Sequence, residues 1–199
     1  IHGQPMISGF EFLVGFTFAS IGPWCSVLSS LPSLERVVFG RQKPETEDER
    51  DLLNLEPLKE LLRKPALRFV TFQRFHFTNE LCHATANALA VASSITDITF
   101  SRCCSFCDGG RAIIAKALKT NTSVTNFEFD GYCDETFYDT LSAVLLCNSP
   151  LQNLILLLLK EGVDGIWLCP IFLSLGMNST LKSLSVSIGD EFGDELGAA

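Results

Sequence analysis

The 199-residue sequence predicts an α/β solenoid, in which strands of one parallel sheet alternate with helices along the chain. Three observations predict it. A triplet of apolar residues at relative positions one, four and six recurs every 27 to 33 residues. A stretch with helical apolar periodicity follows the triplet, and small or polar residues then precede the next triplet. The chain therefore repeats a strand–loop–helix unit, which buries its faces by stacking on its neighbours.

The triplets predict the strands, because side chains two residues apart lie on the same face of an extended chain. The six evenly spaced triplets are Leu34, Val37 and Phe39; Leu67, Val70 and Phe72; Ile95, Ile98 and Phe100; Val124, Phe127 and Phe129; Leu151, Leu154 and Leu156; and Leu181, Leu184 and Val186. An earlier triplet begins at Ile7 or at Leu13. We prefer Ile7, because it gives a first unit of 27 residues, close to the length of the others.

The helices follow from apolar residues spaced three and four apart. This spacing predicts helices over residues 80–92, 110–119 and 134–146. Pro23 and Trp24 are expected to open a further helix that reaches about Leu31. Small and polar residues such as those at 121–123 and 178–180 are expected to stop the helices, because their side chains hydrogen-bond the local backbone.

The repeated unit resembles the leucine-rich repeat family, in its long, ribonuclease-inhibitor-like subtype. Residues 121–129 (NTSVTNFEF) and 178–186 (NSTLKSLSV) carry the resemblance most clearly, and it extends over residues 7–199. The resemblance implies a horseshoe-shaped solenoid with a parallel sheet on the concave side and helices on the convex side. It also implies protein binding rather than catalysis.

On this basis we expect residues 1–199 to form a single array of about seven units. The unit boundaries are 7–33, 34–66, 67–94, 95–123, 124–150, 151–180 and 181–199, of which the last is incomplete and indicates a fragment of a longer array. The sequence departs from the family at position nine of the unit, where Asn or Cys normally binds the loop backbone and only Cys103 fits. Phenylalanine also replaces leucine at many core positions.

Composition and charge exclude several other classes of protein. Hydrophobic residues make up 47% of the chain, which excludes a disordered protein. The longest apolar run, residues 154–159, is too short for a membrane helix. The acidic net charge of −8 argues against a general nucleic-acid binder, which usually carries a basic face, and the excess charge lies in residues 45–51 and 190–199. Eight cysteines are too sparse for a disulfide scaffold, and reduced cysteines favour a cytoplasmic protein.

The first candidate binding feature is a column of arginines. Positions two, three, five, seven and eight of each unit are expected to face the concave surface, and position eight holds Arg41, Arg74 and Arg102. Three guanidinium groups on strands about 4.8 Å apart would clamp a carboxylate or phosphate, or would simply belong to a polar face. The following unit carries Glu128 and Asp130, which polarises the surface along its length.

The second candidate feature is apolar. Ile155, Leu157 and Leu158 are expected on the concave face, because a strand with one buried face cannot bury six consecutive apolar residues. Phe69, at position three of its unit, is expected on the same surface. Either a partner or a segment outside this fragment covers these side chains, or bulky neighbours shield them, or the register differs from the expected one, and the sequence leaves these alternatives open.

The cysteine-rich segment 103–107 is the third feature, and it contains the C-x-x-C pair Cys104 and Cys107. His76, Cys104 and Cys133 share position ten of successive units, so zinc binding and redox chemistry are alternatives to plain packing. One C-x-x-C without a second pair is a weak metal signal, and packing is favoured. We therefore expect no metal and no cofactor.

The sequence predicts no catalytic residue. It holds three histidines and contains neither a G-x-S-x-G motif nor a phosphate-binding P-loop. The expected function is a non-catalytic scaffold that binds a protein partner, and neither nucleic acid nor a membrane. The alternative is a regulatory or sensor segment of a larger protein, such as an immune-type receptor, the substrate arm of a ubiquitin ligase or a GTPase-activating solenoid.

Overall fold

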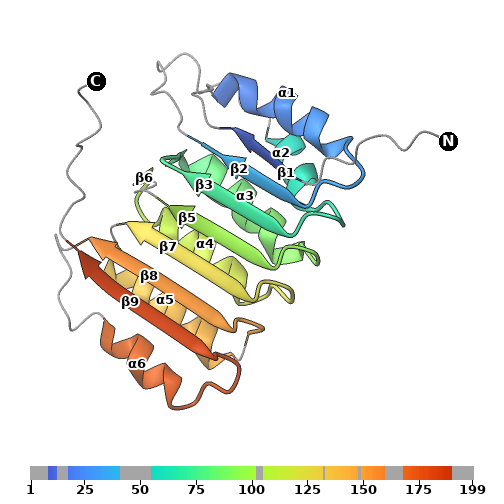
Figure 1. Cartoon of the computed structure of the whole chain (residues 1–199). Coiled ribbons are helices and arrows are strands. Elements are labelled where there is room, and N and C mark those ends of the chain that lie inside the picture. The colour runs from blue at the N-terminus through green and yellow to red at the C-terminus, as the bar shows by residue number, and fades with distance from the viewer. Residues whose placement is uncertain are drawn as a thin grey trace.

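Seven parallel strands form one sheet, and their spatial order follows the chain (Figure 1). The computed structural model describes residues 9–12, 18–40, 55–101, 105–131, 133–147, 149–159 and 168–189. The strands are β1 (Gly9–Phe12), β2 (Arg36–Phe39), β3 (Phe69–Gln73), β5 (Asp97–Ser101), β7 (Asn126–Gly131), β8 (Asn153–Leu159) and β9 (Ser183–Gly189). Two further short strands, β4 (His76–Phe77) and β6 (Ser105–Phe106), pair with each other beside this sheet.

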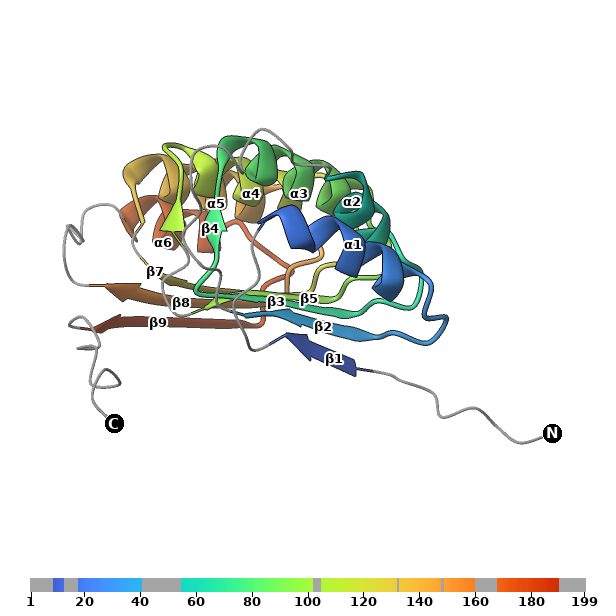
Figure 2. The same cartoon turned by 90° about the horizontal axis from the view of Figure 1, so that it is seen from above.

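The described helices lie along one face of the sheet, as Figure 2 shows. They are α1 (Phe18–Ser29), α2 (Glu56–Leu62), α3 (Asn79–Val91), α4 (Gly110–Leu118), α5 (Glu135–Leu146) and α6 (Cys169–Leu175). Each helix packs against the next one in chain order, so the helices form a second layer on top of the sheet. The expected α/β architecture with a parallel sheet is confirmed, whereas the division into seven units stays a prediction.

Strand pairing aligns the apolar triplets. Phe39 of β2 pairs with Phe72 of β3, which pairs with Phe100 of β5, which pairs in turn with Phe129 of β7. The same register continues to Leu156 and Val186. At the other end, Phe10 and Phe12 pair with Val37 and Phe39, which agrees with a first triplet that begins at Ile7.

The phenylalanines of this register form a stacked column under the helices, which we call the phenylalanine column (Phe39, Phe72, Phe100 and Phe129). The Phe39 and Phe72 rings stack with centroids 5.0 Å apart, and those of Phe72 and Phe100 stack at 5.4 Å. The Phe100 and Phe129 rings are 6.3 Å apart and tilted. All four side chains are buried, and pairs of this kind add about 0.5–1.5 kcal/mol beyond the area that they bury.

A second group of aromatic rings packs between this column and the helices. Phe75 and Phe77 follow β3 and are both buried, and the Phe77 ring stacks on Phe106 at 4.7 Å. Phe77 also meets Phe72 and Phe100 edge-on, at 5.1 and 5.5 Å. Phe75, three residues after Phe72, is thus a buried core aromatic that extends the phenylalanine packing beyond the end of β3.

Helices α3 and α5 follow residues whose side chains cap them. The Thr78 hydroxyl accepts a hydrogen bond from the Leu81 N–H at the start of α3, and the Asp134 carboxylate accepts one from the Phe137 N–H at 2.8 Å before α5. Each of these bonds satisfies a backbone donor that the first turn of a helix leaves unpaired. Before α4 the chain turns at Gly109, whose φ of +70° favours glycine.

The first helix begins earlier than expected, and two short helices were not expected at all. The first helix was expected to open at Pro23, but α1 begins at Phe18 and contains Pro23. A proline near a helix start lacks only a donor that the first turn does not use, which is why the sequence suggested a start there. The sequence analysis also missed α2 and α6, which span 7 residues each and carry a proline in their first turn.

Two asparagine side chains join a turn to the helix that precedes it by one strand–helix unit. Asn121 is buried, and its Nδ2 donates to the carbonyl oxygens of Leu89 and Ala92 at 2.6 and 3.0 Å. Its Oδ1 accepts from the backbone N–H groups of Ser123 and Val124. Asn178 repeats the pattern, donating to the Leu145 carbonyl at 2.6 Å. These bonds give carbonyl groups at the C-terminal ends of α3 and α5 a side-chain donor from the following turn.

Truncation of the phenylalanine column is expected to destabilise the whole sheet. Phe100→Ala removes a buried ring that contacts both neighbouring strands and should lower the free energy of unfolding by about 3–5 kcal/mol. Phe172→Ala, at a side chain that is 53% exposed on α6, should cost less than about 1 kcal/mol. Urea denaturation followed by circular dichroism measures both, and similar small losses for the two variants would contradict the column as the structural core.

Candidate binding surface

The face of the sheet opposite the helices carries the alternate residues of each strand, and we call it the outer face (Figure 2). No described helix covers it. On β3, β5, β7 and β8 the side chains of this face are half-buried, while the residues between them are buried under the helices. The outer-face residues from β3 to β9 are Phe69, Thr71, Gln73, Asp97, Thr99, Ser101, Asn126, Glu128, Asp130, Asn153, Ile155, Leu157, Ser183, Ser185 and Ser187.

One row of the outer face is a chain of side-chain interactions that crosses the strands. The Arg36 guanidinium lies over the Phe69 ring, 4.3 Å from its centroid. Next in the row, Asn126 Nδ2 donates to Asp97 Oδ1 at 2.7 Å, and Asn153 Nδ2 donates to Asn126 Oδ1. The row links neighbouring strands through polar groups that are partly withdrawn from water, where such bonds are stronger than on an open surface.

The middle of the outer face combines acidic and apolar side chains. Glu128 and Asp130 on β7 pair directly with Ile155 and Leu157 on β8. We call these four residues the acidic–apolar patch. On its other side, Ile155 and Leu157 pair with Ser185 and Ser187 of β9, which are exposed. The patch therefore places two carboxylates beside two aliphatic side chains that no described helix covers.

Five of the residues that the sequence analysis placed on the binding surface lie on this face: Phe69, Glu128, Asp130, Ile155 and Leu157. The expectation for Leu158 is wrong. Its side chain is 1% exposed and lies under the helices with Leu154 and Leu156. The physical reason is that β8 continues as a regular strand through Leu159, so strand alternation places position eight on the buried side.

The arginine column is described at one of its three positions. Arg41 and Arg102 lie outside the described residues, so their alignment stays a prediction. Arg74 is exposed and directly follows β3 with a φ of +50°, in the left-handed region that non-glycine residues seldom adopt. Its N–H donates to the Ser101 carbonyl at 3.1 Å. The chain thus turns at position eight in this unit, whereas it stays extended there in β8.

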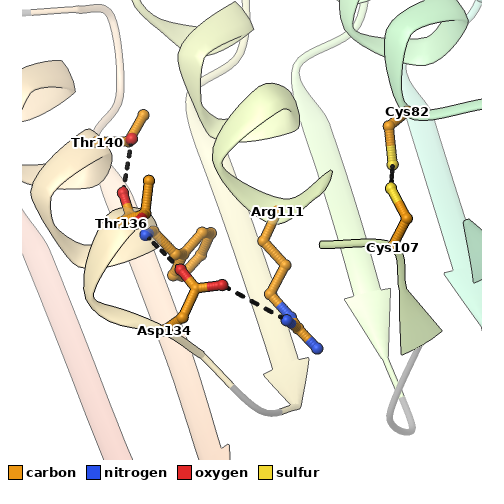
Figure 3. Close-up of polar contacts among 7 residues, drawn as sticks. Cys82, Cys107, Arg111, Asp134, Thr136 and Thr140 are labelled. Atoms are coloured by element: carbon orange, nitrogen blue, oxygen red, sulfur yellow. Dashed lines mark hydrogen bonds and ion pairs between the residues drawn. The ribbon is translucent and has the colours of Figure 1, made fainter. Parts of the chain in front are cut away.

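The cysteine segment is only partly described, since Cys103 and Cys104 lie outside the described residues. Cys107 meets Cys82 of α3, with their sulfur atoms 3.8 Å apart (Figure 3). His76 is exposed on β4, and Cys133 is half-buried before α5. Burial raises the pKa of the Cys133 thiol to about 12. Over the described ranges, no three His, Cys, Asp or Glu side chains gather as metal ligands would.

The end of the sheet at β9 exposes apolar side chains, and we call this the apolar end. Phe172, Leu173 and Met177 of the α6 region and Ile188 of β9 are all more than half exposed. The triplet of this unit, Leu181, Leu184 and Val186, is half-buried, whereas the triplets of the preceding units from Leu34 onward are buried. No described strand pairs with the free edge of β9.

The sequence analysis missed the Asp97–Asn126–Asn153 row and the contact between Cys82 and Cys107. The row had a visible signal, because the three residues occupy position three of successive triplet units. The contact between the two thiols had no such signal in the sequence, because it joins a helix to the loop of the next unit, 25 residues further along the chain.

Comparison with known proteins adds no family assignment: no protein-family model matches the chain, and no curated protein is significantly similar to it. Among the described helices, none has the length and apolar character needed to cross a membrane.

The left-handed backbone at Arg74 yields a prediction about stability. Because glycine adopts a φ of +50° without a Cβ clash, Arg74→Gly should leave the free energy of unfolding unchanged or raise it by up to about 1 kcal/mol. Gln73→Gly, one residue earlier in the extended strand β3, should lower it by about 0.5–1 kcal/mol. Urea denaturation compares the two variants, and an equal loss in both would contradict the turn at Arg74.

Proposed function

We propose that the protein is a non-catalytic scaffold that binds a protein partner through the outer face of its sheet. The observation that carries the proposal is the one-sided cover of a parallel sheet. Parallel sheets occur almost only with both faces covered, because helices normally pack on each side. Here the described helices all lie on one side (Figure 2), and the residues of the other face are half-buried polar, acidic and aliphatic ones.

We further propose that the chain is a divergent leucine-rich repeat solenoid with this face on its concave side. The support is the register, in which equivalent triplet residues pair in every neighbouring pair of strands from β1 to β9. The shared turn chemistry of Asn121 and Asn178, 57 positions apart and each three residues before a triplet, adds to it.

The acidic–apolar patch is the proposed centre of binding. A partner that buries the aliphatic side chains removes apolar surface from water, which favours binding, while the carboxylates beside them select the partner and speed its association. Glu128 and Asp130 therefore favour a partner surface that carries lysine or arginine next to an apolar side chain. Arg74 lies beyond the C-terminal end of β3, which β5 separates from the patch strand β7, and is proposed as a peripheral contact.

A peptide-display selection tests the proposal directly, because it samples many candidate partner sequences at once. Peptides enriched on the protein should carry a basic residue beside an apolar one. Their affinity should fall at least about tenfold in the variant with Glu128→Gln and Asp130→Asn, and again with Ile155→Ser and Leu157→Ser, as measured by isothermal titration calorimetry. Binding of these basic peptides to Glu128 and Asp130 should also weaken with added salt, because salt screens the attraction between charges that solvent reaches.

Matched variants on the helix side serve as controls. Glu80→Gln with Asp139→Asn changes two exposed acids on α3 and α5, and Val91→Ser changes an exposed aliphatic residue of α3. These variants should bind the selected peptides like the original protein. Selected peptides whose binding is lost in the helix-side variants and kept in the patch variants would overturn the proposal.

The apolar end favours a second candidate, a segment that stacks end-on against a further strand–helix unit within a larger regulatory or sensor protein. An exposed apolar surface of this kind usually marks an interaction site. A further strand–helix unit would bury it by stacking on β9 and α6, as each earlier unit stacks on its neighbour. Without such a unit, the protein should self-associate through this end in analytical ultracentrifugation, and Leu173→Asp with Met177→Asp should leave it monomeric. A protein that stays monomeric at high concentration without these changes would contradict this candidate.

A further inference from the structure

The thiols of Cys82 and Cys107, from neighbouring strand–helix units, face each other on the helix side of the sheet. Cys82 lies in the first turns of α3, and Cys107 lies in the loop that leads to α4 (Figure 3). Their sulfur atoms are 3.8 Å apart, within hydrogen-bonding distance for a thiol. The Cys82 side chain is fully buried, whereas Cys107 is partly exposed, and both are free thiols.

The surrounding backbone holds the two thiols in place. The Cys107 N–H donates to the Phe77 carbonyl at 2.9 Å, and the Cys82 N–H donates to the Thr78 carbonyl at 2.9 Å. Pairing of β4 with β6 joins the same two loops, and the Phe77 and Phe106 rings stack across that pair. Both cysteines are therefore anchored on backbone segments that hydrogen-bond to each other.

The first residue of α4 leaves room for the sulfur atoms because it has no side chain. A Cβ at Gly110 would lie 2.7 Å from the Cys82 sulfur and 2.9 Å from the Cys107 sulfur, closer than such atoms approach in proteins. The two sulfurs thus share a space bounded by the helix backbone. A disulfide needs a separation of about 2.05 Å, so the sulfurs must approach by roughly 1.8 Å, which side-chain rotation and adjustment of the loop at Cys107 supply.

We propose that Cys82 and Cys107 form a reversible disulfide that cross-links two neighbouring units when the protein meets a peroxide. The reaction begins at Cys107, because this residue is partly exposed whereas Cys82 is buried. Cys82 is buried away from the peroxide, and burial together with the neighbouring Cys107 sulfur raises the pKa of its thiol, so Cys82 reacts second, as the resolving thiol.

The chemistry is a two-electron oxidation of both thiols by hydrogen peroxide. The Cys107 thiolate attacks one peroxide oxygen, the O–O bond breaks, and Cys107 becomes a sulfenic acid while the leaving hydroxide takes up a proton to form water. The Cys82 sulfur then attacks the Cys107 sulfur, the S–O bond breaks, and the Cys82 proton leaves with the hydroxyl group as a second water. Two thiols and one peroxide thus give one disulfide and two waters, and a dithiol reductant reverses the reaction.

Peptide mapping of the whole chain tests the proposal. The protein is treated with hydrogen peroxide, its remaining thiols are blocked with N-ethylmaleimide, and it is digested with trypsin without reduction. Cleavage after Arg74, Arg102 and Arg111 places Cys82 in peptide 75–102 and Cys107 in peptide 103–111. Mass spectrometry should find these two peptides linked, two hydrogens lighter than their sum, and dithiothreitol should separate them.

Peptide 103–111 also holds Cys103 and Cys104, so a variant must assign the link. In the variant with Cys103→Ser and Cys104→Ser the cross-link should persist at the original yield, and it should vanish with Cys107→Ser. Loss of the link in the former variant, an internal Cys104–Cys107 disulfide, or no cross-link at all would each overturn the proposal. Cys169→Ser, which changes an exposed cysteine of α6, is the matched control and should leave the cross-link unchanged.

A second readout does not depend on the disulfide itself. Cys82→Ala removes the resolving thiol with a small apolar replacement, so the sulfenic acid at Cys107 should accumulate and be trapped by dimedone several times more than in the original protein. Circular dichroism confirms that this variant is folded. Equal dimedone labelling of Cys107 with and without Cys82 would show that Cys82 does not resolve the sulfenic acid and would overturn the proposal.

Discussion

The stacking of phenylalanine rings across neighbouring strands is the interaction on which the rest of the structure depends. Phe39, Phe72, Phe100 and Phe129 pair in register along the sheet, and each ring packs against the next under the helix layer. A slip of one residue in any strand would turn that strand's rings to the other face. The column therefore fixes the register of strands whose contacts lie 28 to 33 residues apart in the sequence.

Once the register is fixed, the alternate residues of every strand must lie on the outer face. Residues at equivalent positions of adjacent strands become neighbours there, because adjacent strands lie about 4.8 Å apart. This is why Asp97, Asn126 and Asn153 join into a hydrogen-bonded row, and why Glu128 and Asp130 stand beside Ile155 and Leu157. The proposed binding chemistry is thus a consequence of core packing on the opposite side of the same strands.

Polar groups connect the units where apolar packing ends. Asn121 and Asn178 each donate to carbonyl groups at the end of the preceding unit's helix and accept from backbone N–H groups of their own turn. Arg111 of α4 similarly reaches Asp134 before α5, with 3.7 Å between Nη1 and Oδ2 (Figure 3). These contacts join successive units on the helix side, as the phenylalanine column joins them on the sheet side.

Much of the fold followed from the sequence, because strand alternation and repeat spacing depend on local residues. The triplets predicted which residues pair, and the helices at 79–91, 110–118 and 135–146 lie within one or two residues of the expected ranges. Leu158 was misplaced because the length of β8 is decided by pairing with β7 and β9 rather than by its own residues. The contact between Cys82 and Cys107 was not predictable, because it depends on how two neighbouring loops dock through β4 and β6.

The central claim is that a parallel sheet in this register keeps one face buried and leaves the other open to a partner. Paramagnetic broadening of methyl resonances by a soluble gadolinium chelate measures this most directly. The methyl groups of Thr99, Ile155 and Leu157 should broaden, while those of their neighbours Ile98 and Leu154, which are buried, should stay sharp. Equal protection of both sets would show that the outer face is covered, and the reverse pattern would show that the register is wrong.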